Sequence, residues 1–283
     1  MMPLAMRRRF YAEEIEATSH IASAAVVDAL ATVPRERFLG PGPWTVRGEN
    51  DFFQIGPFQT PDADPRHVYH NLSIALDPSR QLFNGAPGFV AMVIDRLGLR
   101  AGETVVHIGC GTGYYTALMA HCVGARGRVT ALEVDPALAQ QARANLADFP
   151  WVSVRADDGR ELDRPLDAIF VNAGVTHPLD GWLDALAPGG RLAVPLTISF
   201  TPTIGKGLML LITRGEGDEF AARVVGFVAI YNAVGIRDEA AAQQLGGAMK
   251  RQPLPPLQRL RRDVHSPGAS CWLHRDGACL STE

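Results

Sequence analysis

The chain has 283 residues, of which 47% are hydrophobic and 20% are charged, and its formal net charge is −3. These proportions are typical of a globular protein, and the small charge gives no reason to expect nucleic acid or an anionic membrane as a partner. No apolar run reaches the roughly 18 residues of a membrane span, and residues 1–9 are not followed by the apolar core of a secretory signal. Four cysteines in a chain of this length exclude a disulfide scaffold, so we expect a cytoplasmic protein.

The first 80 residues divide into a helical part and a loop-rich part. Between residues 10 and 38, apolar side chains such as Ile15 and Leu30 recur at helix-like intervals. Residues 40–80 are rich in proline, glycine and aromatic side chains. The aromatic ones include Trp44, Phe52, Phe53, Phe58 and Tyr69. We therefore expect residues 1–80 to form a helical segment followed by a lid over the edge of a sheet.

An apolar run that ends at Ile108 leads into three glycines at alternate positions, Gly109, Gly111 and Gly113. Glycine lets the backbone turn tightly and approach a ligand closely, because it has no Cβ. This pattern is typical of a cofactor-binding turn between a first parallel strand and a helix. The spacing differs from the Gly-x-Gly-x-x-Gly of dinucleotide binders, which argues against a simple NAD site. The alternative is a glycine-rich turn that binds no ligand.

Glu133 ends a second predicted strand, 129–132, about 20 residues after the glycines. A carboxylate in this place accepts hydrogen bonds from the hydroxyls of a ribose, and we predict this role for Glu133. Asp135 directly precedes Pro136 and is expected to cap the next helix, 137–146. The alternative for Glu133 is an ordinary carboxylate in a loop.

Strands and helices continue to alternate after this point. Strands are predicted at 151–156, 166–174 and 191–196, a helix at 179–186, and a turn at 187–190. The alternation predicts an α/β fold with a doubly wound, mostly parallel sheet. Ligands of such sheets bind beyond the carboxyl ends of the strands. Those ends carry the remaining polar candidates, Asp157, Asp158 and Asn172, together with Gly159.

These motifs resemble the class I methyltransferases that use S-adenosylmethionine, and more specifically the protein-L-isoaspartate O-methyltransferase family. The closer resemblance rests on six stretches: 33–38, 86–87, 113–114, 156–159, 189–195, and a late antiparallel hairpin that we predict from 208–214 and 224–231. It implies a Rossmann-like methyltransferase core over residues 81–235. Residues 236–283 form an extension outside the resemblance, with a predicted helix over 238–250.

The resemblance also implies an activity, a cofactor and site residues. The activity is carboxyl O-methylation of isoaspartyl or aspartyl groups in peptides or proteins, a protein repair reaction. The cofactor is S-adenosyl-L-methionine, and S-adenosyl-L-homocysteine is the product. Glu133 would bind the ribose, Asp158 would accept from the adenine amino group beside the Gly159 backbone, and the three glycines of the loop and Asn172 would complete the site.

One departure from the family lies next to the glycine loop. The family usually carries an acid two residues before the first glycine, where it orients the methionine end of the cofactor. This chain has His107 there, and a neutral imidazole forms hydrogen bonds without supplying the negative charge. Direct contact of His107 with the cofactor and burial of His107 beneath the loop are both open.

The substrate loop departs further. The family pattern is Thr-Ile-Ser-Ala-Pro-His, and this chain has Gly85 and Gly88 in place of the serine and the histidine. The amide of Asn84 can donate to a carboxylate, so we expect Asn84 and the Gly85 backbone to position the substrate. A carboxylate is already a nucleophile and needs no general base, whereas an alcohol or phenol acceptor would need one, for which His177 is the candidate. Restoring the serine by Gly85→Ser is expected to raise isoaspartyl activity if its loss is what impairs it.

Two cysteines of the extension, Cys271 and Cys279, frame a predicted turn at 276–277 and are expected to approach across a hairpin. His265 and His274 lie nearby in the sequence. A metal site formed by these four residues is the alternative, but their spacing matches no common zinc pattern, so we predict an unpaired hairpin and no metal.

Two alternatives to the isoaspartyl enzyme remain open. The first is a methyltransferase for another peptide or a small-molecule acceptor. The second is an adaptor that binds the cofactor with weak or no catalysis, for which residues 236–283 would provide a partner or dimer contact.

Overall fold

The computed structural model describes residues 2–48, 56–163, 165–275 and 277–283. Phe52 and Phe53 of the predicted lid lie outside these residues. The chain divides into two units, of which unit 1 comprises residues 1–102 and 110–156, and unit 2 comprises 103–109 and 157–283. This division into two units does not test the domain boundaries that we predicted near residues 80 and 235.

Unit 1 begins with two helices, α1 (Leu4–Ser19) and α2 (Ala24–Thr32), followed by the 3₁₀ helix η1 (Arg35–Phe38). They confirm the helical character predicted for this region, with an interruption after α1. The reason for the interruption is that His20 adopts a left-handed conformation and ends α1. The side chain of Asp95 then accepts hydrogen bonds from the backbone of the residues just before α2.

A small antiparallel sheet follows where the sequence predicted only loops. Its strands are β1 (Thr45–Arg47), β2 (Phe58–Gln59), β3 (Ser73–Asp77) and β4 (Leu82–Phe83), in the order β2-β1-β3-β4. The 3₁₀ helices η3 (Pro65–Val68) and η4 (Pro78–Arg80) lie between them in the chain. Strands of two to five residues are too short to show the alternation by which a strand is detected.

The remainder of unit 1 contains three helices and two parallel strands. The helices are α3 (Pro87–Leu97), α4 (Tyr114–Val123) and α5 (Pro136–Asn145), and the strands are β6 (Arg128–Glu133) and β7 (Val152–Ala156). In the register of the pair, Glu133 lies opposite Ala156, so both strands end at the same edge. Asp135 caps α5 by accepting from the N–H groups of Ala137 and Leu138, as predicted.

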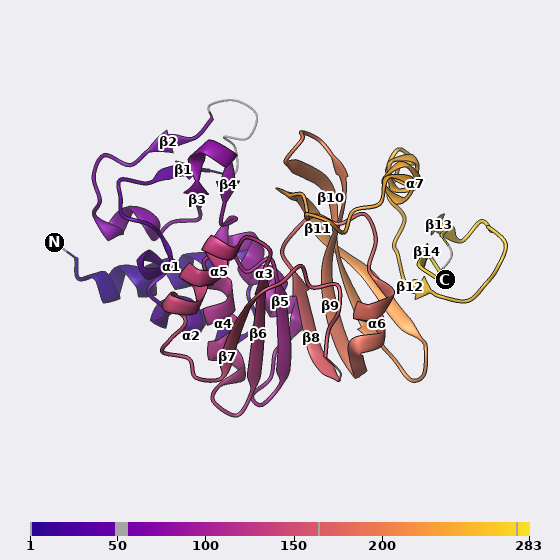
Figure 1. Cartoon of the computed structure of the whole chain (residues 1–283), viewed down its shortest axis with the longest axis horizontal. Helices are drawn as coiled ribbons and strands as arrows, with labels where there is room; N and C mark the ends of the chain where they lie inside the picture. The colour runs from indigo at the N-terminus through magenta and orange to yellow at the C-terminus, as the bar shows by residue number, and fades with distance from the viewer. Residues whose placement is uncertain (1, 49–55, 164, 276) are drawn as a thin grey trace. The chain divides into compact units, whose positions relative to one another are not determined.

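Unit 2 contains a sheet in the order β13-β14-β12-β11-β10-β9-β8-β5, with β8 to β11 side by side in Figure 1. The parallel strands are β5 (Thr104–Ile108), β8 (Leu166–Val171) and β9 (Leu186–Ser199). The antiparallel strands are β10 (Ile204–Arg214), β11 (Phe220–Tyr231), β12 (Arg259–Arg261), β13 (Cys271–Leu273) and β14 (Cys279–Ser281). The helices are α6 (Asp180–Ala185) and α7 (Glu239–Met249).

The predicted α/β fold class is confirmed, including the parallel core and the late hairpin, which is β10–β11. The boundaries need two corrections. The predicted strand 166–174 ends at Val171, and the predicted turn 187–190 lies within β9 rather than before it. Pairing with β8 shifts register across this segment, so its extra residues are accommodated as an irregularity of the strand.

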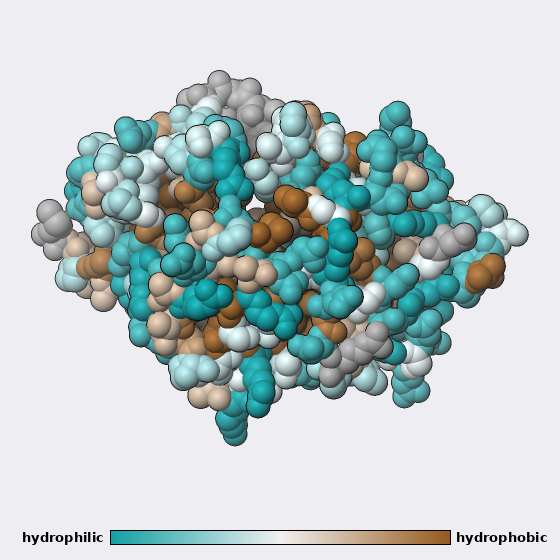
Figure 2. Space-filling model, viewed as in Figure 1, coloured by the Kyte–Doolittle hydropathy of each residue, from teal (hydrophilic) through white to brown (hydrophobic). Residues whose placement is uncertain are grey.

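The side chains follow the usual division between core and surface. Figure 2 shows that most of the visible face is hydrophilic, with hydrophobic residues in small patches. Among the described residues, no helix combines the length and apolar character needed to cross a lipid bilayer.

Candidate functional site

Glu133 and the glycine loop are joined by hydrogen bonds in unit 1. The backbone N–H of Gly111 donates to Glu133 Oε2 at 2.8 Å, and the N–H of Asp135 donates to Oε1 at 3.1 Å. The side chain is buried, since Glu133 is only 7% exposed. Burial raises the pKa of Glu133, while the backbone N–H groups act in the opposite direction. Glu133 is therefore an oriented, largely desolvated carboxylate beside the loop, the arrangement that suits a ribose diol.

The loop is packed too closely to accept a side chain at its last glycine. Gly113 has a φ of +96°, and a Cβ there would lie 2.8 Å from Cδ1 of Leu146. A further tie comes from Asn145, whose Nδ2 donates to the carbonyl oxygen of Thr112 at 2.9 Å. The hydroxyl of Thr112 in turn donates to the carbonyl oxygen of Phe38 at 2.6 Å. These contacts fix the loop against α5 and η1.

In the part of the chain that the structure describes, Asn84 of the substrate loop has a side-chain N–H group without a hydrogen-bond partner. Oδ1 of Asn84 accepts from the N–H of Ile74 at 2.9 Å, whereas its Nδ2 is buried without a hydrogen-bond partner among the described residues. Gly85 has a φ of +81° and accepts a hydrogen bond from the hydroxyl of Tyr115 at 2.9 Å. Tyr115 thus holds this loop, a role that was not predicted from the sequence.

The second glycine of the substrate loop, Gly88, has no room for a side chain because other side chains fill the space beside it. The N–H of Gly88 donates to Oδ1 of Asn71 at 2.8 Å. A Cβ on Gly88 would lie 2.6 Å from Oγ of Ser19 and 2.9 Å from Nδ2 of Asn71. The histidine of the family pattern therefore does not fit this backbone without displacing both neighbours. Nothing in the sequence near Gly88 signals these two contacts.

His107 lies in β5 of unit 2 and is completely buried. Its ring stacks on Phe170 of β8 with centroids 5.1 Å apart and an interplanar angle of 3°. Burial lowers the pKa of His107 to about 3, so the imidazole is neutral at physiological pH. Beyond the end of β5, Gly109 lies against the backbone of Asn172, whose N–H donates to the carbonyl oxygen of Ile108 at 2.8 Å.

Asp158 and Gly159 lie after β7, in unit 2. Asp158 is half-buried and forms an ion pair with Arg160 at 3.2 Å, measured from Nε to Oδ2. The N–H of Gly159 donates to Oδ1 of Asp157 at 2.8 Å, and its carbonyl accepts from Nε1 of Trp182 at 2.7 Å. Trp182 is fully buried and was not predicted to support this turn.

His177, the candidate base for another acceptor, is half-buried in unit 2. Its Nδ1 lies 2.9 Å from the hydroxyl oxygen of Thr176, and burial lowers the pKa of its imidazole.

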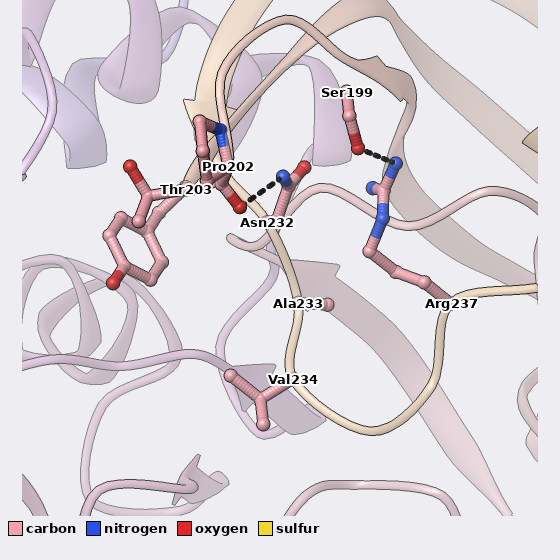
Figure 3. Close-up of a pocket in the computed structure, with 8 residues that line it drawn as sticks. Ser199, Pro202, Thr203, Asn232, Ala233, Val234 and Arg237 are labelled. Atoms are coloured by element: carbon pink, nitrogen blue, oxygen red, sulfur yellow. Dashed lines mark hydrogen bonds between the residues drawn. The ribbon is translucent and has the colours of Figure 1, made fainter.

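Unit 2 also contains a pocket of about 340 Å³ that includes none of the predicted site residues (Figure 3). Arg237 lies at its wall, and Figure 3 shows its guanidinium directed toward Ser199. The same guanidinium donates to the carbonyl oxygen of Gly174 at 2.6 Å and to Oγ1 and the carbonyl oxygen of Thr197. Arg237 therefore holds backbone in place at the wall of this pocket.

Comparison with known proteins identifies the family. The family model described as protein-L-isoaspartate(D-aspartate) O-methyltransferase (PCMT) matches residues 59–207. The chain belongs to this family. The protein-L-isoaspartate O-methyltransferase of Methanothrix thermoacetophila is 33% identical over 187 residues, which cover 64% of this chain and 78% of the relative. That of Methylorubrum extorquens is 32% identical over 225 residues, covering 77% of this chain and 85% of the relative.

Solved structures of this family share the fold of the chain. One protein-L-isoaspartate O-methyltransferase aligns with a TM-score of 0.65 and 22% identity, covering 86% of this chain and 69% of that one. A putative member from Plasmodium falciparum, solved in complex with S-adenosyl-L-homocysteine, aligns with a TM-score of 0.56 and 16% identity. That alignment covers 81% of this chain and 97% of the other. The resemblance inferred from the sequence motifs is confirmed.

Proposed function

We propose that this chain is an S-adenosylmethionine-dependent carboxyl O-methyltransferase that methylates isoaspartyl or aspartyl carboxylates in peptides or proteins. Membership of the protein-L-isoaspartate O-methyltransferase family gives the reaction class. The observation in this chain that carries the proposal is the buried Glu133 carboxylate, fixed by the N–H of Gly111 in the glycine loop.

Glu133 has the acceptor capacity that a ribose requires. The N–H of Gly111 donates to one carboxylate oxygen of Glu133 and the N–H of Asp135 to the other, and the backbone of Val134 also favours the ionised form. A carboxylate has about four acceptor sites in all, so these backbone contacts leave capacity for a hydroxyl of the ribose. When bound, S-adenosylmethionine supplies an electrophilic methyl group, and S-adenosylhomocysteine is the product.

Other cofactor contacts remain our predictions from the sequence. We assign Asp158 to the adenine amino group, with the Gly159 backbone beside it. The amino-acid end is assigned to the glycine loop. The remaining residues predicted to contact the cofactor are His107, Gly109, Gly111, Gly113 and Asn172.

Asn84 is the residue we assign to positioning the acceptor. Its Nδ2, which has no hydrogen-bond partner among the described residues, lies in the segment that leads directly into α3, and the amino-terminal end of a helix favours a negative charge. The acceptor carboxylate is ionised at neutral pH, so its oxygen forms the new bond to the methyl carbon as the carbon–sulfur bond breaks. No proton is transferred in this step, and the chain has to align the reactants and exclude water.

The test is methyl transfer from labelled S-adenosylmethionine to an isoaspartyl peptide, measured beside the identical peptide with aspartate. We expect transfer to the isoaspartyl peptide and little to its aspartyl twin. Transfer to neither peptide, by folded protein that binds S-adenosylhomocysteine, would overturn the isoaspartyl proposal in favour of another acceptor or an adaptor.

A variant of Asn84 tests the acceptor site separately. Asn84→Asp keeps an oxygen for the N–H of Ile74 and replaces the free donor with a negative oxygen, which repels a carboxylate. We expect kcat/KM for the isoaspartyl peptide to fall by about tenfold or more, with S-adenosylhomocysteine affinity unchanged. Unchanged kcat/KM would remove Asn84 from the acceptor site.

Cytoplasmic localisation and a dimer or partner contact through residues 236–283 remain predictions from the sequence.

A further inference from the structure

Four side chains with metal-binding atoms meet at the β13–β14 hairpin of unit 2. They are His265, Cys271, His274 and Cys279, and one ligand atom of each lies within 4.8 Å of those of the other three. Both cysteines are buried, both are free thiols, and both histidines are half-buried. This extension lies outside residues 59–207, which match the family model, so the cluster is independent of the proposed methyl transfer.

The distances fit a tetrahedral ion after a small contraction. Zinc binds thiolate sulfur at about 2.3 Å and imidazole nitrogen at about 2.0–2.1 Å, which places neighbouring ligand atoms about 3.3–3.8 Å apart. Sγ of Cys271 already lies 3.6 Å from Nε2 of His265. The rings of His265 and His274 are in edge contact, with centroids 4.8 Å apart, and a ligand atom of each lies within 4.8 Å of the sulfur atoms of both cysteines.

The hydrogen bonds around the cluster leave its ligand atoms available. Nδ1 of His265 lies 2.8 Å from the carbonyl oxygen of Asp263, so a proton on Nδ1 is donated there and the lone pair of Nε2 faces Cys271. This is the backbone contact that commonly orients a metal-bound histidine. Nδ1 of His274 is buried and has no hydrogen-bond partner among the described residues. Sγ of Cys271 accepts from the N–H of Gly268 at 3.4 Å, a contact that favours the thiolate.

We propose that these four side chains bind one zinc ion. Two sulfur and two nitrogen ligands in a tetrahedral arrangement are typical of zinc. The four protein ligands leave no position for water or substrate, so the site is structural rather than catalytic. Its ligands come from the loop after β12, from β13 and the residue after it, and from β14. These strands have three residues each, and the ion would join them to the loop that connects β12 with β13.

The proposal revises the absence of a metal that we predicted from the sequence. That prediction rested on spacing, because five residues separate His265 from Cys271, two separate Cys271 from His274, and four separate His274 from Cys279. The spacing of ligands along the sequence does not show which ligands the folded chain brings together. Here the antiparallel pairing of β13 with β14 brings the second cysteine back to the first, and the preceding loop adds His265.

The test uses the full chain, purified without chelator and with its thiols reduced. We expect elemental analysis to find about one zinc per chain. Exchange for Co²⁺ should give the visible d–d absorption and the thiolate charge-transfer band of a tetrahedral site. Cys279→Ser should lose both the zinc and the cobalt spectrum, and Cys122→Ser, which changes a buried thiol of unit 1, should keep them.

If Cys279→Ser does not fold, the wild-type chain still decides the question. Zinc would be removed with a chelator and Co²⁺ titrated back while the spectrum and the melting temperature are recorded. Recovery of the tetrahedral spectrum together with a higher melting temperature supports the site. Neither zinc nor a cobalt spectrum in folded protein with reduced thiols would overturn it, as would a native disulfide between Cys271 and Cys279 identified by mass spectrometry.

Discussion

The N–H of Gly111 donates to the buried carboxylate of Glu133 at 2.8 Å, which joins the middle of the glycine loop to the end of β6. The loop and its acid are therefore oriented relative to each other before a ligand binds. Groups that are already in position lose little conformational freedom on binding, so more of their interaction energy appears as affinity. This relationship makes Glu133 the most direct point at which to test the cofactor site.

Replacing Glu133 by alanine should weaken the binding of S-adenosylhomocysteine by about 1–3 kcal/mol, or roughly 5- to 150-fold in Kd, because hydrogen bonds to a buried charged group are lost. Isothermal titration calorimetry measures this directly. Asp148→Ala is the control, since Asp148 is an exposed acid of the same unit and should leave Kd unchanged. Equal affinity of wild type and Glu133→Ala would place the ribose elsewhere.

The affinity for S-adenosylhomocysteine should also depend on the protonation of Glu133. Burial raises the pKa of this carboxyl, so lowering the pH through that raised value neutralises it and removes acceptors. We expect Kd to increase over this range in the wild type, with a flatter profile in Glu133→Gln. A profile that is the same in both proteins would assign the titration to another group.

The raised pKa of Glu133 affects ligand binding and stability in opposite directions. A rise in pH should improve ligand binding through Glu133 but lower the contribution of Glu133 to the stability of the ligand-free chain. The pKa of Glu133 is higher in the folded state than in the unfolded state, so the folded state binds its proton more tightly. The contribution of this group to the free energy of unfolding therefore falls as the pH rises between the two values. A carboxylate that is costly to keep ionised in the absence of ligand is consistent with a binding role.

Gly85→Ser should lower activity, contrary to the expectation from the sequence. The φ of +81° at Gly85 is unfavourable for serine, and the new Cβ would lie 3.3 Å from Cγ2 of Val90. We expect a loss of about 1–2 kcal/mol in stability and a lower kcat/KM, because the loop that carries Asn84 is displaced. Urea unfolding and the isoaspartyl assay measure the two effects.

Gly98→Ser is the matched control for the substitution at Gly85. Gly98 ends α3 with a φ of +60° and has no neighbouring atom within 4 Å of a new Cβ. It should show a similar loss of stability and normal activity. Higher activity in Gly85→Ser than in wild type would show that the family serine is the missing group after all.

Local motifs made part of this site predictable. The glycine loop, Glu133 and the Asp135 cap lie within about one βαβ unit, where composition and spacing are enough to assign roles. The approach of Cys271 and Cys279 across a hairpin was predicted, but not that His265 and His274 join them, because the four ligands meet only once the hairpin and the preceding loop have folded. The same is true of Gly88, whose environment is set by Ser19 and Asn71.

The sheet of short strands in unit 1 depends on a contact that no local pattern reveals. Arg35 of η1 is completely buried and donates to the backbone carbonyl oxygens of Val68, His70 and Leu72 at 2.7, 3.0 and 2.6 Å. A buried guanidinium that pairs with carbonyl oxygens rather than with an acid holds backbone, and here that backbone leads into β3. In the sequence, Arg35 looks like an ordinary charged residue just after a helix.

Arg35→Lys should therefore destabilise the chain by about 2–4 kcal/mol, because one ammonium group lacks the planar fork that reaches three carbonyl oxygens and leaves some of them buried without a donor. Arg37→Lys is the control. Arg37 lies two residues away, is 40% exposed and pairs with Asp148, so its replacement should change the free energy of unfolding by less than about 1 kcal/mol. Urea unfolding of the two variants and the wild type measures the difference. Equal stability of Arg35→Lys and Arg37→Lys would show that a single ammonium group at position 35 is enough to hold the segment before β3.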